Sequence, residues 1–257
     1  MKSESYVGIT DFMTGDQARA MTEVFVRCGG TRIGRLLMVG VMMSHKTLHG
    51  LPTKWTAAFP AKENVSPIFL PHAAALNTLH YADYENVTRL TDLEAVVRWC
   101  GPNLDAIQFD MVWPEPKMLA ALHAIHPSLR FILQVGKNAL AQANDNPVEL
   151  VRRLDAYDIH DVLLDRSMGR GKPLEASVLM PFIDALIEHL PHLDITVAGG
   201  LGPDTFQLVE PLVRNYRSIS VDAQGQLRAS GNALDPIDWP RAVAFLEGII
   251  PLLSSVS

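Results

Sequence analysis

Side chains that can transfer protons follow short apolar runs at several places along the chain, and aspartate recurs among them. A carboxyl group acts as a general acid or base when its pKa lies near the working pH. The recurrence therefore predicts proton-transfer chemistry on a small molecule. The chemically capable residues, in chain order, are Thr10, Asp11, Ser44, His45, Lys46, His80, Tyr81, Asp83, Asp110, Gln134, Lys137, Asp165, Arg166 and Asp222.

Two glycine-containing turns late in the chain predict a binding site for a phosphate group. The first, Gly199-Gly200, ends an apolar β-branched run and precedes apolar residues at helical spacing. The second, Ala223-Gln224-Gly225, ends the next apolar run. Glycine lets the backbone come close to a ligand, and N–H groups at a helix start favour an anion. Carboxylates facing such a site predict proton transfer on a phosphosugar.

The elements that must position these groups alternate between strand and helix patterns. Alternation through eight strands in 257 residues is typical of a single-domain (β/α)8 TIM barrel over 1–257, with its active site at the carboxyl ends of the strands. A doubly wound open sheet is the alternative, but the count of eight and the paired turns favour the barrel. The predicted strands cover 6–9, 35–43, 74–81, 106–109, 131–135, 162–164, 195–198 and 219–221. The predicted helices cover 16–28, 86–99, 114–125, 147–157, 174–190, 205–213 and 240–253.

The segment 44–71 departs from this alternation, because it holds histidines and prolines without a sustained period. We expect an extended loop that has local structure and a functional role. No histidine pair is predicted to lie four residues apart on a helix, so we expect no metal site. After the sixth predicted strand, Arg170 and Lys172 lie between glycines. This stretch is either a lid that closes over the substrate or an ordinary charged loop.

Composition narrows the possible partners and the compartment. The net charge of −6 is spread along the chain without a basic cluster, which argues against nucleic acid or an anionic membrane surface. The sequence has no apolar run long enough to span a membrane and no apolar signal core near its start. The two cysteines, Cys28 and Cys100, are expected to be reduced thiols. Together these features predict a cytoplasmic protein, and they leave its oligomeric state open.

Six short motifs occur in a characteristic order: Gly8-Ile9-Thr10, Ile107-Gln108-Phe109, Leu163-Leu164-Asp165, Gly169-Arg170-Gly171-Lys172, Ala198-Gly199-Gly200-Leu201 and Val221-Asp222. With these motifs the chain resembles phosphoribosylanthranilate isomerase, the barrel enzyme of tryptophan biosynthesis, most closely in its second half. The resemblance implies an Amadori rearrangement, in which an aminoaldose becomes an aminoketose. It also implies that the turns after the seventh and eighth strands hold a phosphate.

The resemblance further assigns roles to single residues. Asp165 matches the family's general acid, which protonates the ring oxygen as the furanose opens; a cap for the following turn is the other interpretation. The general base, a cysteine in the family, aligns with Val7, which cannot accept a proton. Asp110 falls at the fourth-strand histidine position and is the candidate substitute base, with Asp11 as a second. The implied substrate and phosphate ligands are Gly199, Gly200, Leu201, Asp222, Gln224, Gly225, Lys46 and Gln108.

Three functions remain open. The first is the family's isomerisation of a phosphoribosylated amine. The second is an aldolase or epimerase acting on another phosphosugar, with Lys137 as a Schiff base or Asp110 as the working group. The third is a phosphosugar-binding protein without catalysis, because Val7 stands where the family has its base. In each case the expected partner is a phosphorylated small molecule, and no cofactor or metal is expected.

Overall fold

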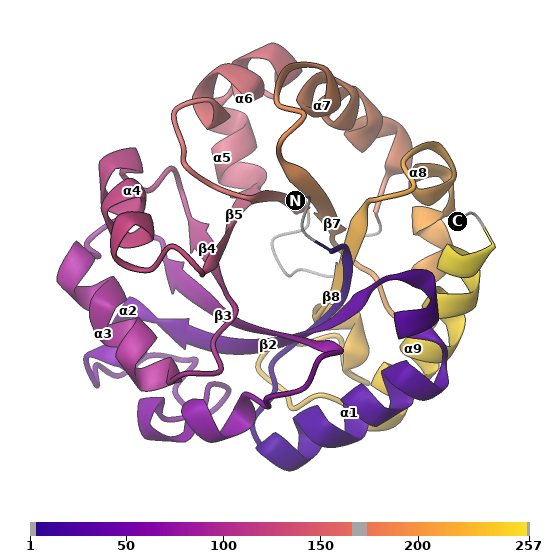
Figure 1. Cartoon of the computed structure of the whole chain (residues 1–257), viewed down its shortest axis with the longest axis horizontal. Coiled ribbons are helices and arrows are strands. Elements are labelled where there is room, and N and C mark those ends of the chain that lie inside the picture. Colours follow the sequence, from indigo (N-terminus) through magenta and orange to yellow (C-terminus); the bar gives the residue numbers. More distant parts are fainter. Residues whose placement is uncertain (1–3, 166–173, 256–257) are drawn as a thin grey trace.

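Eight parallel strands form a closed barrel in which each strand pairs with the next in chain order and β8 pairs with β1. The computed structural model describes residues 4–165 and 174–255. Figure 1 shows the strands as an inner ring and the helices as an outer ring. The architecture confirms the predicted single (β/α)8 barrel and excludes the open sheet. The strands are β1 Tyr6–Thr10, β2 Leu36–Ser44, β3 Ala75–Asp83, β4 Ala106–Met111, β5 Arg130–Gly136, β6 Asp161–Asp165, β7 Asp194–Ala198 and β8 Ser220–Ala223.

Several helices begin where a polar side chain satisfies free backbone N–H groups. Thr14 and Gln17 form a capping box at the start of α1, and Asn146 caps α6. Gly29, with φ at 92°, follows the end of α1 in the left-handed conformation that the sequence predicts there. The α-helices of the described residues are α1 Gly15–Arg27, α2 His45–Leu48, α3 Leu90–Cys100, α4 Pro116–Ile125, α5 Lys137–Gln142, α6 Pro147–Leu154, α7 Ala176–His189, α8 Glu210–Asn215 and α9 Trp239–Ser254.

The start of α3 differs from the predicted start at Asn86. The carboxylate of Asp83 accepts hydrogen bonds from the backbone N–H groups of Val87 and Thr88, both at 2.8 Å, and these bonds hold the chain in a turn. Asn86 itself has a positive φ of 51°. The helix therefore begins only at Leu90, and Val87, within the predicted helix, is exposed in the turn before it.

The segment 44–71 has the expected local structure, because it contains α2 and two 3₁₀ turns, Lys62–Asn64 and Ser66–Ile68. The predicted helix over 205–213 is divided into a 3₁₀ turn, η4 (Phe206–Val209), and the short helix α8. Pro211, near the start of α8, explains this division, because proline has no N–H to continue the helical hydrogen bonds.

Strand side chains alternate between two apolar layers. Val7 and Ile9 of β1, with the corresponding residues of the other strands, pack between the barrel and the helices. The interior is filled by a second cluster, consisting of Tyr6, Met38, Leu76, Ala106, Ile132 and Leu163. This packed interior closes the barrel below the carboxyl ends of the strands, where (β/α)8 barrels place their active sites.

Both cysteines are free, with Cys100 buried and Cys28 partly so, as expected for reduced thiols. Among the described residues, no helix is long and apolar enough to cross a membrane.

Candidate active site

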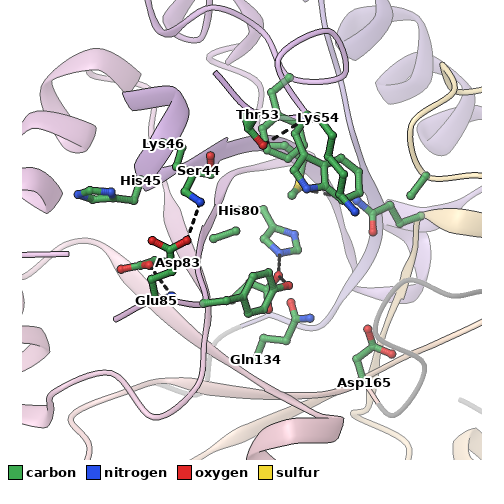
Figure 2. A pocket seen from close by; sticks show the side chains of 18 residues that line it. Ser44, His45, Lys46, Thr53, Lys54, His80, Asp83, Glu85, Gln134 and Asp165 are labelled. Atoms are coloured by element: carbon green, nitrogen blue, oxygen red, sulfur yellow. Dashed lines mark hydrogen bonds and ion pairs between the residues drawn. The ribbon is translucent and has the colours of Figure 1, made fainter. Parts of the chain in front are cut away.

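A cavity of about 340 Å³ opens at the carboxyl ends of the strands. Figure 2 shows His80 between Lys54 on one side and Gln134 and Asp165 on the other. Residues from β2 to β6, from the segment after β2 and from the turn after β8 line this cavity. Of the residues that the sequence predicts for the site, the cavity brings together Lys46, Asp110, Asp165 and Gln224.

His80 on β3 lies in contact with a carboxylate. Its Nε2 atom is 3.4 Å from Oδ2 of Asp110 on β4, and the same oxygen accepts a hydrogen bond from the Tyr84 hydroxyl. Burial alone would lower the pKa of the His80 imidazole, but the carboxylates of Asp110, Asp222 and Asp11 outweigh burial and raise it. His80 and Asp110 therefore form a pair between which a proton can move.

The side chains of two buried glutamines, Gln108 and Gln134, form a chain of polar contacts that begins at the other ring nitrogen of His80, Nδ1. The Gln108 amide nitrogen lies 3.2 Å from His80 Nδ1 and donates to Oε1 of Gln134 at 2.8 Å. The Gln108 oxygen has no hydrogen-bond partner within the described chain. A rotation of the Gln108 amide would turn its oxygen toward a protonated Nδ1 of His80. Gln108 can therefore form a hydrogen bond with the His80 imidazole in both of its protonation states. Gln108 is fully buried, contacts His80 and does not line either of the two cavities that the predicted site residues share.

Asp222 on β8 is the most strongly perturbed carboxyl group near the cavity. Asp165, Ala198, Asp222 and Gly8 are consecutive partners in the register of β6, β7, β8 and β1. The small Ala198 and Gly8 leave space for the carboxyl group, and a Cβ added at Gly8 would lie 2.3 Å from its Oδ1. Burial, reinforced by the nearby Asp165 carboxylate, raises the pKa of Asp222 to about 7. Asp222 can therefore hold or release a proton near neutral pH.

The two predicted glycine turns meet beside Asp165. Gly199, Gly200 and Gly225 line a second cavity of about 30 Å³ together with Asp165 and Asp222. Positive φ angles of 113° and 65° at the first two require glycine. The helix start expected after them is only the 3₁₀ turn η4, so its dipole contributes little to holding an anion. Because two carboxyl groups face this cavity, a dianion fits best when Asp222 is protonated.

Asp11, the second candidate base, has a structural role instead. Its carboxylate forms a buried ion pair with Arg228 and accepts a hydrogen bond from the Gln224 amide at 3.1 Å. Arg228 in turn donates to the backbone oxygen of Gln224 at 2.8 Å. This network fixes Gln224, which lines both cavities, and keeps Asp11 engaged away from the larger one.

Val7 does not face the site. It belongs to the layer between barrel and helices, whereas Gly8 and Thr10 of the same strand point inward toward Asp222. The alignment that places Val7 at the family's cysteine is therefore wrong in side-chain direction. The position of β1 that approaches the site is Thr10, whose hydroxyl lies 3.4 Å from Oδ1 of Asp222.

Three other predicted residues have different surroundings from those expected. Lys46 lines the larger cavity and forms an ion pair with Glu85 at 2.5 Å. Lys137 is exposed at the first position of α5 and lines neither of the two cavities, which removes the support for a Schiff base there. The Leu201 side chain is buried in the outer apolar layer. Arg166, Arg170 and Lys172, including the proposed lid, lie outside the described residues.

An aromatic wall of the larger cavity was not predicted. Trp55 and Phe59 stack with ring centroids 5.5 Å apart, and the Lys54 ammonium lies 5.0 Å from the centre of the Trp55 ring. Both aromatic residues line the cavity. The only signal in the sequence was their spacing of four residues within a segment expected to be a loop. The segment after β2 thus supplies an apolar side to a cavity whose opposite side is polar.

The histidine spacing was also misjudged, because His45 and His49 lie four residues apart at the two ends of α2. Together with Asp92 of α3 they form the one group within the described ranges whose side chains could jointly hold a metal ion.

No model of a known protein family matches the chain, and no curated protein matches it in sequence. Its fold is similar to solved structures of low identity. Active domain 2 of the chitinase from Pyrococcus furiosus gives a TM-score of 0.62 at 9% identity, covering 100% of this chain and 97% of that one. The YdjI aldolase from Escherichia coli K12 gives 0.51 at 8%, covering 98% and 90%. The Rubisco-like protein from Rhodopseudomonas palustris gives 0.57 at 12%, covering 98% and 64%.

At such low identity these likenesses show the fold alone. The chain is a (β/α)8 barrel, a fold that it shares with both a chitinase domain and an aldolase. A fold of this kind hosts many unrelated reactions, so any function has to be argued from the site.

Proposed function

We propose that the chain is an aldose–ketose isomerase that carries out an Amadori rearrangement on a phosphoribosylated amine, as phosphoribosylanthranilate isomerase does in tryptophan biosynthesis. The observation that carries this proposal is that Asp165 and Asp110 line one cavity beside the glycine turns. The reaction needs an acid and a base that reach the same small molecule, and a grip on its phosphate. The free cysteines support a reducing compartment such as the cytoplasm.

In the first step, Asp165 donates a proton to the ring oxygen of the furanose, and the bond between C1 and that oxygen breaks. The nitrogen lone pair forms the C1=N bond, giving a protonated imine. Asp165 suits this role because it is only 7% exposed and lines both cavities. A group in that position reaches the sugar while the phosphate lies between the glycine turns.

In the second step, the Asp110 carboxylate removes the proton from C2, and the electrons of that C–H bond form an enolamine. Protonation at C1, with loss of the proton from the C2 hydroxyl, then gives the aminoketose, so the reaction needs no oxidant or reductant. The Tyr84 hydroxyl and His80 orient the carboxylate of Asp110. His80, with its raised pKa, can donate a solvent-derived proton to C1.

The phosphate and the amine of the substrate, at its two ends, each have chemically suitable surroundings in the site. We assign the phosphate to the smaller cavity, where the backbone of Gly199, Gly200 and Gly225 is open and a protonated Asp222 can donate to a phosphate oxygen. The stacked rings of Trp55 and Phe59 suit a flat aromatic amine at the other end.

Steady-state turnover of phosphoribosylanthranilate by the purified protein tests this proposal. We expect Asp165→Asn and Asp110→Asn each to lower kcat by about 10²–10⁴-fold, the usual contribution of a general acid or base. Asp204→Asn, at an exposed aspartate paired with Arg241, is the matched control and should keep wild-type activity. The wild-type gene should also rescue a tryptophan auxotroph that lacks the isomerase.

A wild-type protein that neither converts the substrate nor rescues the auxotroph would exclude this activity. Ligand-dependent thermal stabilisation without conversion would favour a binding protein instead. Turnover of a different phosphosugar that Asp110→Asn abolishes would favour an epimerase or aldolase on the same barrel.

A further inference from the structure

We propose that His45, His49 and Asp92 form a binding site for a divalent transition metal, with Zn²⁺ as its best occupant, which ties α2 to α3 at the rim of the larger cavity. The three residues come from two helices and take no part in the proposed reaction. The inference does not depend on the proposed function.

The two histidines are placed by α2. Ser44 and Thr47 form a capping box at its start, which holds this short helix in place. The backbone N–H of His49, the residue that ends α2, donates to the oxygen of His45 at 3.2 Å, so about one helical turn separates them. Their rings therefore lie on the same side of the helix, with centroids 4.5 Å apart. Two histidines at this spacing are a common metal-ligand pair.

Asp92 completes the group from the first turn of α3. Its Oδ1 lies 3.0 Å from His49 Nε2, and its Oδ2 lies 3.9 Å from His45 Nε2. The backbone N–H of Arg89 donates to the same Oδ2 at 2.8 Å and so orients the carboxylate. Such a second contact is typical of a metal-ligating carboxylate.

The spacing of the three donors fits one ion. Metal–ligand bonds of about 2.0–2.2 Å place neighbouring donors roughly 3–4 Å apart. The two measured spacings lie in this range, and all three donor atoms lie within 4.8 Å of one another. Two imidazoles and one carboxylate suit Zn²⁺ better than Mg²⁺ or Ca²⁺, which prefer oxygen ligands. His49 is exposed, so water can complete the coordination.

The site lies at the cavity wall but outside the reacting groups. His45 lines the larger cavity, yet Figure 2 shows its ring turned away from His80 and Asp165. A bound ion would therefore restrain α2, and with it Ser44 and Lys46, rather than act on the substrate. Without a metal, the same geometry is a hydrogen bond between His49 and Asp92, and metal titration distinguishes the two.

Titration of metal-free protein with Zn²⁺ by calorimetry, and with Co²⁺ by visible absorption, tests the site. We expect one ion per chain, a Co²⁺ spectrum of a site with nitrogen and oxygen ligands, and a thermal midpoint that rises with Zn²⁺. His49→Ala and Asp92→Asn should each weaken binding at least tenfold and abolish the thermal shift. His192→Ala, at an exposed histidine on another part of the surface, is the matched control and should bind as the wild type does.

Asp92 is the third residue of α3, and its Oδ2 accepts the backbone N–H of Arg89. Asparagine keeps a side-chain oxygen that can accept the same hydrogen bond, and equal far-UV circular dichroism of the variant and the wild type distinguishes a lost ligand from a misfolded helix. Absence of Zn²⁺ binding by the wild type would overturn the proposal, and so would binding that these two substitutions leave unchanged.

Discussion

The proton affinity of single buried side chains decides what this site can do. Asp222 is 6% exposed and holds its proton up to a pH of about 7, whereas a carboxyl group in an unfolded chain loses it near pH 4. Strand pairing places Asp222 between two small residues, Gly8 and Ala198, and these leave space for its carboxyl group beside the glycine turns. A protonated Asp222 therefore makes room for a phosphate, which an ionised Asp222 would repel.

The same shift makes stability depend on pH. Between pH 4 and pH 7 the folded protein binds one more proton at Asp222 than the unfolded chain, so the free energy of unfolding falls as pH rises. From pH 5 to pH 8 this amounts to roughly 2–3 kcal/mol. Asp222→Asn cannot ionise and should lose less stability over that interval than the wild type. Urea denaturation of both proteins at the two pH values measures the difference, and equal losses would contradict the assigned pKa.

For individual residues, the sequence predicted which side chains lie at the ends of the strands but not which of these side chains contact one another. Asp110 and Asp165 were placed at the site from their positions after apolar runs. The contact between His80 and Asp110 depends on the pairing of β3 with β4, in which His80 faces Gln108 and Ala82 faces Asp110. No local pattern encodes that register. The pairing of Asp11 with Arg228 was missed for the same reason, because the two lie far apart in the sequence.

Individual elements determine the direction in which each side chain points. In β1 the inward positions are Tyr6, Gly8 and Thr10, because successive side chains of a strand face opposite sides. A motif match fixes the residue order but not this direction, since moving the start of a strand by one residue exchanges its two faces. That is why the aligned position Val7 was assigned to the site and lies outside it.

The direction of Val7 has a measurable consequence. A cysteine there would lie between the barrel and the helices, so Val7→Cys should leave the turnover of phosphoribosylanthranilate within about twofold of wild type. Unfolding by urea should show a modest destabilisation, below about 1.5 kcal/mol, because the two side chains have similar volumes. A large gain in turnover would restore the alignment with the family's cysteine and contradict the placement of β1.

Helix positions were predictable where the pattern was long and capped, as in α1, α6 and α9. They were not predictable where a side chain captures the backbone first. Asp83 delays α3 in this way, and Pro211 divides the helix after the glycine turns. The helix α2 has only four residues, too few to show a period, and this hid the spacing of His45 and His49.

The molecule as a whole was predictable because eight apolar β-branched runs, separated by helices, have few ways to bury both faces of every strand. Function is less determined, since the same barrel serves a chitinase domain and an aldolase at 9% and 8% identity. The two ends of the barrel have different polar groups. Those at the carboxyl end form the candidate site, whereas Arg130, Asp161 and Asp194 at the amino end form an ion-pair cluster.

That cluster gives a stability prediction. Arg130 donates from Nε to Oδ2 of Asp161 at 2.6 Å, and both residues are buried. Arg130→Met leaves the Asp161 carboxylate without its main partner, so we expect a loss of about 3–5 kcal/mol in the free energy of unfolding. Arg152→Met, at an exposed ion pair on α6, is the control and should leave the free energy of unfolding close to its wild-type value.

The loss at Arg130 should be smaller at pH 5 than at pH 8. Burial already raises the pKa of Asp161 to about 6 with its partner in place, and without the guanidinium the carboxyl group keeps its proton more tightly. A protonated Asp161 no longer carries a buried charge at pH 5. Urea denaturation at both pH values checks this, and a loss that does not change with pH would show that Asp161 stays ionised.

Proton NMR of the reaction in D₂O tests the central claim most directly. If Asp165 opens the ring and Asp110 removes the C2 proton of phosphoribosylanthranilate, the purified protein should form the aminoketose with one solvent deuterium at C1. Asp110→Asn should lower that rate by at least a hundredfold, while Asp204→Asn keeps it. No conversion, or conversion that does not depend on Asp110 and Asp165, would contradict the account.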